Sequence, residues 1–568
     1  IIIIVGTLDW VVIGIFFLAL IGIIVWVVKQ KQNDSADYFL GGRDATWLAI
    51  GASIFASNIG SEHLIGLAGA GASSGMAMAH WEIQGWMILI LGWVFVPFYS
   101  RSMVYTMPEF LERRYNPQSR TILSVISLIS YVLTKVAVTV YAGGLVFQQV
   151  FGIKELWGID FFWIAAIGLV VLTALYTIFG GMKSVLYTSV LQTPILLLGS
   201  LIILVLGFKE LGGWDEMMSI CSAVTVNEYG DTMTQLIRDN NDPNFPWLGA
   251  LVGSAIIGFW YWCTDQFIVQ RVLSGKNEKE ARRGTIFGAY LKLLPVFLFL
   301  IPGMIAFALH QKYIGAGGEG FLPLLANGTA NADAAFPTLV AKLLPAGVKG
   351  LVVCGILAAL MSSLASLFNS SAMLFTIDFY KRFKPETPEK KLVGIGQIAT
   401  VVIVILGILW IPIMRSVGDV LYTYLQDVQS VLAPGIAAAF LLGICWKRTS
   451  AKGGMWGLIA GMIIGLTRLG AKVYYSNTAI TDSSMFKYLF YDLNWLFFCG
   501  WMFLFCIIVV IAVSLMTEAP SAEKIQGLVF GTSTPEQKAA TRASWNHWDI
   551  IHTVIILAIT AAFYWYFW

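Results

Sequence analysis

The chain is 568 residues long, 58% of them hydrophobic and only 12% charged, and its formal net charge is +3. Its mean hydropathy is +0.76. A soluble domain keeps roughly a quarter of its residues charged, so this composition excludes a water-soluble protein and predicts one that lies mostly in a membrane. The small net charge gives no reason to expect a nucleic-acid partner.

The sequence contains no Walker loop, no dinucleotide-binding fingerprint and no HExxH metal site. Its six cysteines have no metal-ligand spacing. No loop is long enough to predict a separate catalytic domain. We therefore expect a membrane protein that is not an enzyme.

Apolar runs long enough to cross a bilayer, which takes about 20 residues, recur along the whole chain. They lie at residues 8–28, 46–71, 75–100, 121–150, 158–179, 184–208, 246–270, 284–310, 337–379, 392–414, 419–444, 453–471, 493–516 and 547–568. They predict an all-α polytopic membrane protein with about 14 transmembrane helices. The run at 337–379 is too long for one straight span, and we expect it to extend beyond the bilayer at one end.

Lys and Arg residues are concentrated in alternate loops. They cluster at residues 101–120, 271–283, 381–391 and 447–452, whereas the intervening loops hold few. Because cytoplasmic loops are enriched in Lys and Arg, the first set is predicted to be cytoplasmic. This places both termini on the extracellular or periplasmic side of the cell membrane, as an even number of spans requires.

Two of the runs are interrupted by polar residues. In the second run Asn58, Ser61, Glu62 and His63 surround Gly60, and in the seventh a polar stretch occupies residues 258–266. Small residues also allow tight helix packing. However, the pattern suits helices that break at the membrane midplane, where freed carbonyls can coordinate a cation. Each break falls in the first helix of one half if runs two to six and seven to eleven are halves, as an inverted-repeat transporter requires.

Glu82, Lys135 and Lys292 lie at bilayer depth, where an ionisable group is costly and is a functional candidate by default. They either form structural ion pairs between helices or line a water-filled cavity whose donors and acceptors replace the hydration of a polyol. His63 is open in the same way, between a packing role and contact with the substrate.

Three serines, Ser362, Ser363 and Ser366, are close together in the ninth run. Serine hydroxyls in a helix commonly bond back to their own backbone. Beside a broken helix they are also hard oxygen ligands, which suit a small hard cation such as sodium.

Six longer stretches carry a resemblance to a known family. They are ASNIGSEH (56–63), TMPEFLERRY (106–115), WYWCTDQFIVQR (260–271), YLKLLP (290–295), MSSLASLFNS (361–370) and WKRTSAKGGMW (446–456). At these residues the sequence resembles the sodium/solute symporter family and, within it, the sodium/glucose cotransporters. The resemblance covers nearly the whole chain.

The resemblance implies a leucine-transporter-like core of ten helices in two inverted repeats. The predicted boundaries are 1–45 for an N-terminal helix and cytoplasmic loop, 46–208 for the first repeat, 209–245 for an extracellular loop, 246–444 for the second repeat and 445–568 for three C-terminal helices.

The resemblance also implies the roles of individual residues. The implied sugar-binding set is Asn58, His63, Glu82, Lys135, Lys292 and Gln426, with Tyr261 closing under the sugar ring and Trp262 beside it. The implied sodium site consists of the carbonyls of Ala56, Ile59 and Ala359 and the hydroxyls of Ser362 and Ser363.

Two residues depart from the family pattern. Ser189 stands where many members carry an Asp that is associated with a second cation, which argues against a second sodium site. Gly258 stands where other members have Thr or Asn, which implies that one sugar contact is missing.

We therefore expect a sodium-coupled symporter that imports a neutral sugar of the glucose or galactose type by alternating access. The same fold carrying myo-inositol or another organic solute, or serving as a non-transporting sensor of sodium and sugar, stays open. Lys292, Glu82 and Gln426 together favour a neutral polyol. A carboxylate solute calls for an unpaired arginine or for an open helix N-terminus aimed at the anion, and no arginine lies mid-membrane in the sequence. The expected partners are the solute, sodium and the lipid bilayer; the sequence gives no oligomeric state.

Overall fold

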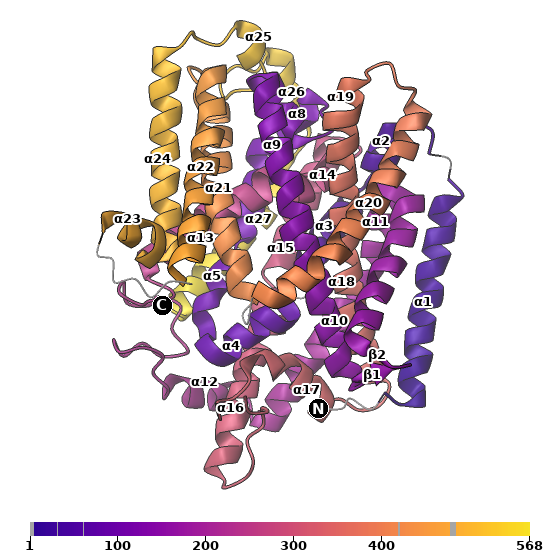
Figure 1. Ribbon diagram of the computed structural model, residues 1–568, viewed down its shortest axis with the longest axis vertical. Helices are drawn as coiled ribbons and strands as arrows, with labels where there is room; N and C mark the ends of the chain where they lie inside the picture. Colours follow the sequence, from indigo (N-terminus) through magenta and orange to yellow (C-terminus); the bar gives the residue numbers. More distant parts are fainter. Residues whose placement is uncertain (1–4, 31, 61, 326, 418–420, 477–483) are drawn as a thin grey trace.

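The computed structural model describes residues 5–568 except 31, 61, 326, 418–420 and 477–483. At residues 133–134, 149–150, 413–417, 421–427, 473 and 476 it describes the backbone but not the side chains. The described chain is almost entirely helical (Figure 1), with one short hairpin in which β1 (Glu155–Leu156) pairs antiparallel with β2 (Ile159–Asp160). The predicted all-α class is confirmed.

The first half of the chain forms twelve α-helices among the described residues. They are α1 (Thr7–Val28), α2 (Ser35–Leu40), α3 (Trp47–Asn58), α4 (Ala68–Ser74), α5 (Ala79–Glu82), α6 (Gly85–Ile90), α7 (Val96–Ser102), α8 (Met107–Arg114), α9 (Pro117–Ser130), α10 (Ala137–Phe151), α11 (Phe161–Leu211) and α12 (Trp214–Ser222).

The second half continues with α13 to α27 in the described residues. They are α13 (Trp247–Gly258), α14 (Gln266–Leu273), α15 (Glu278–Lys292), α16 (Ile301–Gly315), α17 (Ala335–Leu343), α18 (Val348–Met373), α19 (Lys381–Phe383), α20 (Glu389–Val417), α21 (Leu421–Cys445), α22 (Ala451–Ser476), α23 (Met485–Lys487), α24 (Trp495–Met516), α25 (Ala522–Ile525), α26 (Pro535–Ala543) and α27 (His547–Tyr566).

Within the described residues, 11 helical segments are long and apolar enough to cross a membrane, and Trp47–Asn58 and Ala137–Gln148 are shorter apolar helices. The count of 14 spans stays a prediction. One reason for the difference is α11, which covers two predicted runs in 51 residues. It bends at Gly181, whose φ of 54° favours glycine, and a Cβ there would lie 2.4 Å from the Tyr38 carbonyl oxygen.

The prediction for residues 337–379 is wrong in one respect. Instead of one helix, the structure has two, α17 and α18, separated by a turn, and the extension of the run beyond the bilayer stays a prediction. The turn contains Pro345 and Gly347, and Gly347 has a φ of 85°. Proline disfavours a helical residue before it, and a positive φ ends a helix, so the periodic apolar run is cut at this point.

Both predicted helix breaks are present. Helix α3 ends at Asn58, and Ile59 is extended (φ −78°, ψ 111°) before a π-helical stretch begins at Glu62. Ser61 lies outside the described residues. In the second half, Asp265 is extended (φ −77°, ψ 128°) between Phe259–Thr264 and α14, and its carboxylate accepts a hydrogen bond from the Phe267 amide. This cap satisfies a donor that the broken helix leaves free.

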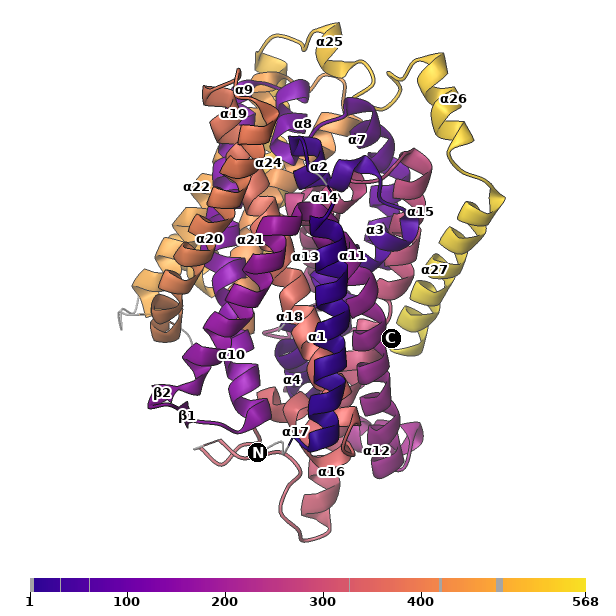
Figure 2. The same ribbon diagram turned by 90° about the vertical axis from the view of Figure 1, so that its right-hand side faces the viewer.

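The segments that position the site pack in the middle of the molecule. Helix α11 packs along α18, and α3 packs against α15, α11 and α18. Helices α1 and α24 lie at opposite edges in Figure 1, and α27 lies at the edge of the turned view in Figure 2.

Helix α1 is tied to α18 by one carboxylate. Asp9 Oδ1 accepts hydrogen bonds from the amides of Gly347 at 2.6 Å and Gly350 at 2.7 Å, and Asp9 is fully buried. Gly347 immediately precedes α18 and Gly350 lies in its first turn, where the N–H groups have no partner within the helix. The carboxylate therefore caps α18 from a neighbouring helix.

Candidate functional site

The predicted substrate-binding residues surround one cavity in the centre of the molecule. Every one of them whose side chain the structure describes lines it: Asn58, His63, Glu82, Lys135, Tyr261, Trp262 and Lys292. Gln426 lies in α21, but its side chain is outside the described part of the chain. The cavity is formed where the breaks after α3 and α13 meet α5, α10, α15 and α18.

An ion pair forms one wall of the cavity. Lys292 Nζ lies 2.6 Å from Glu82 Oε2 and donates to Asn58 Oδ1 at 3.1 Å. His63 Nε2 lies 3.4 Å from the same Glu82 oxygen. All four side chains are buried, and all four line the cavity. The Glu82 carboxylate and the Lys292 ammonium group neutralise each other there. The two readings of Glu82 and Lys292, ion pair and cavity lining, therefore hold together.

Two aromatic side chains form a second wall. The rings of Tyr261 and Trp262 meet edge to face, with centroids 4.9 Å apart. Asn58 Nδ2 donates to the Tyr261 hydroxyl at 3.2 Å, and Trp262 Nε1 donates to Gln84 Oε1 at 3.3 Å. Polar tips thus fix both rings, which present apolar faces suited to a sugar ring.

Lys135 lines the cavity but has a partner that the sequence reading did not assign. Its Nζ lies 2.7 Å from Asp265 Oδ2, and the Tyr131 hydroxyl donates to the other Asp265 oxygen. The ammonium group also lies 4.9–5.3 Å from four aromatic ring centroids, those of Tyr131, Trp260, Tyr261 and Phe267. Lys135, in the π-helical segment Tyr131–Val136 that precedes α10, therefore joins this segment to the break in the second half.

The predicted sodium residues come from the end of α3, where the first break begins, and from α18. Ser363 Oγ donates to the carbonyl oxygens of Ser57 at 2.9 Å and Ile59 at 3.1 Å. Ala359 and Ser362 are on the same helix, α18, and Ala56 is in the last turn of α3; all are buried. Carbonyl and hydroxyl oxygens are hard, neutral ligands and fit sodium. No group of three or more His, Cys, Asp or Glu among the described residues could hold a metal ion instead.

Ser189 belongs to a buried cluster of hydroxyls next to this site. Its Oγ lies 3.4 Å from Ser362 Oγ and 3.5 Å from Ser53 Oγ, and it donates to the Val185 carbonyl at 2.6 Å. The three side chains are neutral. Ser189 stands where many family members carry an Asp, and the groups around it in this cluster are hydroxyls.

Sequence reasoning missed four polar residues of the site. Gln84, Gln429 and Glu62 line the cavity, and Asp265 pairs with Lys135. Three of them lie near residues or runs that were already assigned: Gln84 comes two residues after Glu82, Gln429 comes one helical turn after Gln426, and Asp265 lies within the polar stretch 258–266. Glu62 was noticed without a role.

The comparisons with known proteins agree with this geometry. Residues 38–461 match the model of the sodium:solute symporter family. The sodium/myo-inositol cotransporter 2 of Homo sapiens is 37% identical over 538 residues, which cover 92% of this chain and 79% of the relative. The sodium/glucose cotransporter 1 of Ovis aries is 37% identical over 529 residues, covering 90% and 79%.

A solved structure shares the fold. A sodium-coupled sialic acid symporter, in a substrate-bound outward-open state, superposes with a TM-score of 0.73 at 22% identity and covers 91% of this chain and 99% of its own. The expected fold class is confirmed. As predicted, the family and its members are transporters and not enzymes, and sodium is the coupling ion. The chain is a sodium-coupled membrane transporter and belongs to the sodium:solute symporter family.

Proposed function

We propose that this symporter imports a neutral sugar of the glucose or galactose type together with sodium. The observation that carries the proposal is the pairing of charges around the cavity. Glu82 with Lys292, and Lys135 with Asp265, cancel each other, and Glu82, Lys292 and Lys135 line the cavity, where their remaining lone pairs and N–H groups can meet hydroxyls. Glu62, a further carboxylate of the described lining, also disfavours an anionic solute. The described cavity lining contains no arginine, the residue that best receives a carboxylate solute.

Myo-inositol is the second candidate solute. It is also a neutral ring with many hydroxyls, so the same paired donors and acceptors suit it. One relative named for myo-inositol and one named for glucose are equally similar to this chain, each at 37% identity. Gln426, assigned on the family resemblance, and Gln429 complete the proposed solute site.

The proposed sodium site uses the carbonyls of Ala56, Ile59 and Ala359 and the hydroxyls of Ser362 and Ser363. It would share the break after α3 with the solute site: the Asn58 side chain faces the cavity, and the next carbonyl, that of Ile59, faces Ser363. A ligand that orders this break lowers the cost of ordering it for the other ligand. This supports thermodynamic coupling between sodium and solute, which is reciprocal by necessity.

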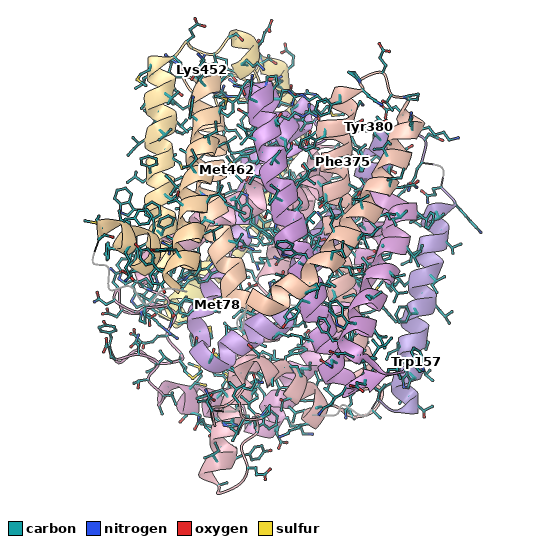
Figure 3. The ribbon with its side chains drawn as sticks, in the orientation of Figure 1. Met78, Trp157, Phe375, Tyr380, Lys452 and Met462 are labelled. Carbon is teal, nitrogen blue, oxygen red and sulfur yellow. The ribbon has the colours of Figure 1, made fainter. Side chains whose placement is uncertain are left out.

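We further propose that the end of the molecule with α2, α8, α19 and α25 is cytoplasmic and that both termini are outside. The Lys- and Arg-rich loops lie at this end, and cytoplasmic loops favour these residues. Figure 3 shows Lys452 near it and Trp157 towards the opposite end. Trp157 is 85% exposed, as an aromatic anchor at a membrane interface would be.

Uptake into proteoliposomes tests the proposal. The purified chain would be given labelled glucose, galactose, myo-inositol and sialic acid, each with and without an inward sodium gradient. Sodium-dependent accumulation of glucose or galactose supports it, and accumulation of myo-inositol alone selects the second candidate. Sodium-dependent binding of a sugar without accumulation would contradict transport and identify a sensor.

A further inference from the structure

Gln84 is a buried cavity residue that neither the ion pairs nor the sodium site uses. It lies in the gap between α5 and α6, where Ile83 (φ −80°, ψ 27°) and Gln84 (φ −89°, ψ 24°) leave helical geometry. Its Nε2 donates to the Ser254 carbonyl at 2.8 Å, and its Oε1 accepts from the Trp262 indole at 3.3 Å. The side chain therefore crosses to α13 and anchors an aromatic wall of the cavity.

Gly258 makes room for this side chain. Its backbone is helical (φ −62°, ψ −40°), so no left-handed conformation demands a glycine. A Cβ at this position would lie 2.6 Å from Gln84 Oε1 and 2.9 Å from Gln84 Cδ, closer than van der Waals contact permits. The space that a side chain at 258 would fill is thus occupied by the Gln84 amide, and both residues line the cavity.

We propose that Gln84 and Gly258 form a specificity-determining pair of the solute site, in which the Gln84 amide binds one hydroxyl group of a neutral ring polyol. A primary amide has two N–H donors and two acceptor lone pairs. In the described structure Ser254 and Trp262 take one of each, which leaves one donor and one acceptor at the cavity. A hydroxyl both donates and accepts, so it matches this remainder.

With Gln84 beside it, Gly258 no longer implies that a solute contact is lost. The missing contact that Gly258 implied is supplied from the other half of the chain, by a longer side chain that reaches the same wall. Because the amide is already fixed at two of its atoms, it offers its remaining groups at low entropic cost. The proposal rests on the proposed function, since it concerns which solute the same site prefers.

The first test measures KM for sodium-driven uptake of the preferred sugar and of its singly deoxygenated analogues. In the unaltered protein, removal of the hydroxyl that Gln84 binds should raise KM about fivefold to tenfold. In Gln84→Ala the sugar itself should show this rise, and that one deoxy analogue should then differ little from the sugar. Discrimination among the analogues that is the same in both proteins would overturn the proposal.

The second test uses the glycine. Gly258→Ala should displace the amide and reproduce the Gln84→Ala pattern, and adding it to Gln84→Ala should change KM little further. Gly168→Ala is the matched control, because no atom lies within 4 Å of a Cβ there, and it should leave KM unchanged. Additive effects of the 84 and 258 substitutions would refute the pair.

Thermal unfolding of the same four variants in detergent separates this inference from the proposed function. Gly258→Ala should lower Tm in the Gln84 background and have little effect in the Gln84→Ala background, whatever solute is transported. If no sugar or inositol is taken up, the proposed function fails while this coupling persists. If the two Tm changes add, the pair itself is wrong.

Discussion

Glu82 and Lys292 contribute opposite charges to one buried wall of the cavity, with Lys292 Nζ 2.6 Å from Glu82 Oε2. The contact between Glu82 and Lys292 serves two purposes in the proposed site. The pair neutralises two charges inside the membrane, and its free lone pairs and N–H groups face the space where the solute is proposed to bind.

Glu82→Gln should therefore lower the apparent solute affinity at least tenfold. The change keeps the side-chain volume but leaves the Lys292 ammonium without its counter-charge, and breaking a buried pair costs about 3–5 kcal/mol. Binding of labelled solute to the purified protein measures the loss, and solute-free sodium binding shows that the protein is folded. Near-normal affinity would contradict the assignment.

The control for Glu82 is an exposed pair. Lys487 Nζ lies 3.0 Å from Asp492 Oδ1 in an outer segment, with 22% and 41% of the two side chains exposed. Pairs of this kind contribute about 0–1 kcal/mol, so Asp492→Asn should leave uptake and stability nearly unchanged.

Two substitutions of Tyr261 distinguish the contribution of its aromatic ring from that of its hydroxyl group. Tyr261→Phe removes the contact with Asn58 Nδ2 at 3.2 Å but keeps the ring against Trp262, so about 0.5–1.5 kcal/mol is lost and much of the uptake should remain. Tyr261→Ala removes the ring and should abolish coupled transport. Initial rates over a range of solute concentrations distinguish the two, and full activity of the alanine variant would exclude a gating role.

Ser363→Ala should raise the sodium concentration for half-maximal uptake, because it removes a proposed ligand beside the Ile59 carbonyl. Solute affinity should fall with it, since the coupling of two ligands is reciprocal. Ser370→Ala is the matched control: its hydroxyl is buried on the same helix but donates to Gln270 Oε1 at 2.8 Å. A sodium dependence that shifts equally in both variants would point to a structural effect and against the site.

We expect one sodium ion per solute molecule, with a Hill coefficient near one. The hydroxyls of Ser189, Ser53 and Ser362 are neutral, and a second uncompensated cation beside them would cost several kcal/mol. Reversal potentials measured over several sodium gradients give the stoichiometry. A value of two would refute the argument, and a return to one in Glu62→Gln would identify that cavity carboxylate as the compensating acid.

Asp265→Asn should reduce both thermal stability and transport rate, because it leaves the Lys135 ammonium among aromatic rings without its anion. Lys135→Met in the same protein should recover part of the lost stability, since the unpaired charge is then absent. A double-mutant cycle on Tm measures this coupling. Strict additivity would show that the two groups do not interact as described.

The apolar runs and the two polar interruptions were sufficient to predict the helical class and the breaks. Spacing along the chain follows from helix periodicity, and Gly60 and the polar stretch 258–266 mark where that periodicity fails. The division of 337–379 into α17 and α18 was missed because hydropathy does not register the backbone effect of Pro345 and Gly347.

The sequence predicted which residues belong to the site better than it predicted which of them contact each other. Charged residues at bilayer depth are few, so Glu82, Lys135 and Lys292 stand out in the sequence. Which acid each lysine meets depends on the packing of helices far apart in the chain, and 130 residues separate Lys135 from Asp265. Gln84 has no charge to draw attention to it, and the role proposed for it rests on its contacts with Ser254 and Trp262 and on the space left at Gly258.

The Asp9 carboxylate links α1 to α18, the helix that carries Ser362 and Ser363 of the proposed sodium site. It binds the start of α18 at Gly350, which lies about 20 Å along the helix axis from Ser363 at 1.5 Å per residue, so a displacement of α1 acts on the same helix as Ser363. Helix α1 lies outside the predicted repeats and carries a lipid-exposed surface, with Leu18 72% exposed. A displacement of α1 in the bilayer would therefore be passed through Asp9 to the helix that carries Ser362 and Ser363, two of the residues proposed to bind sodium.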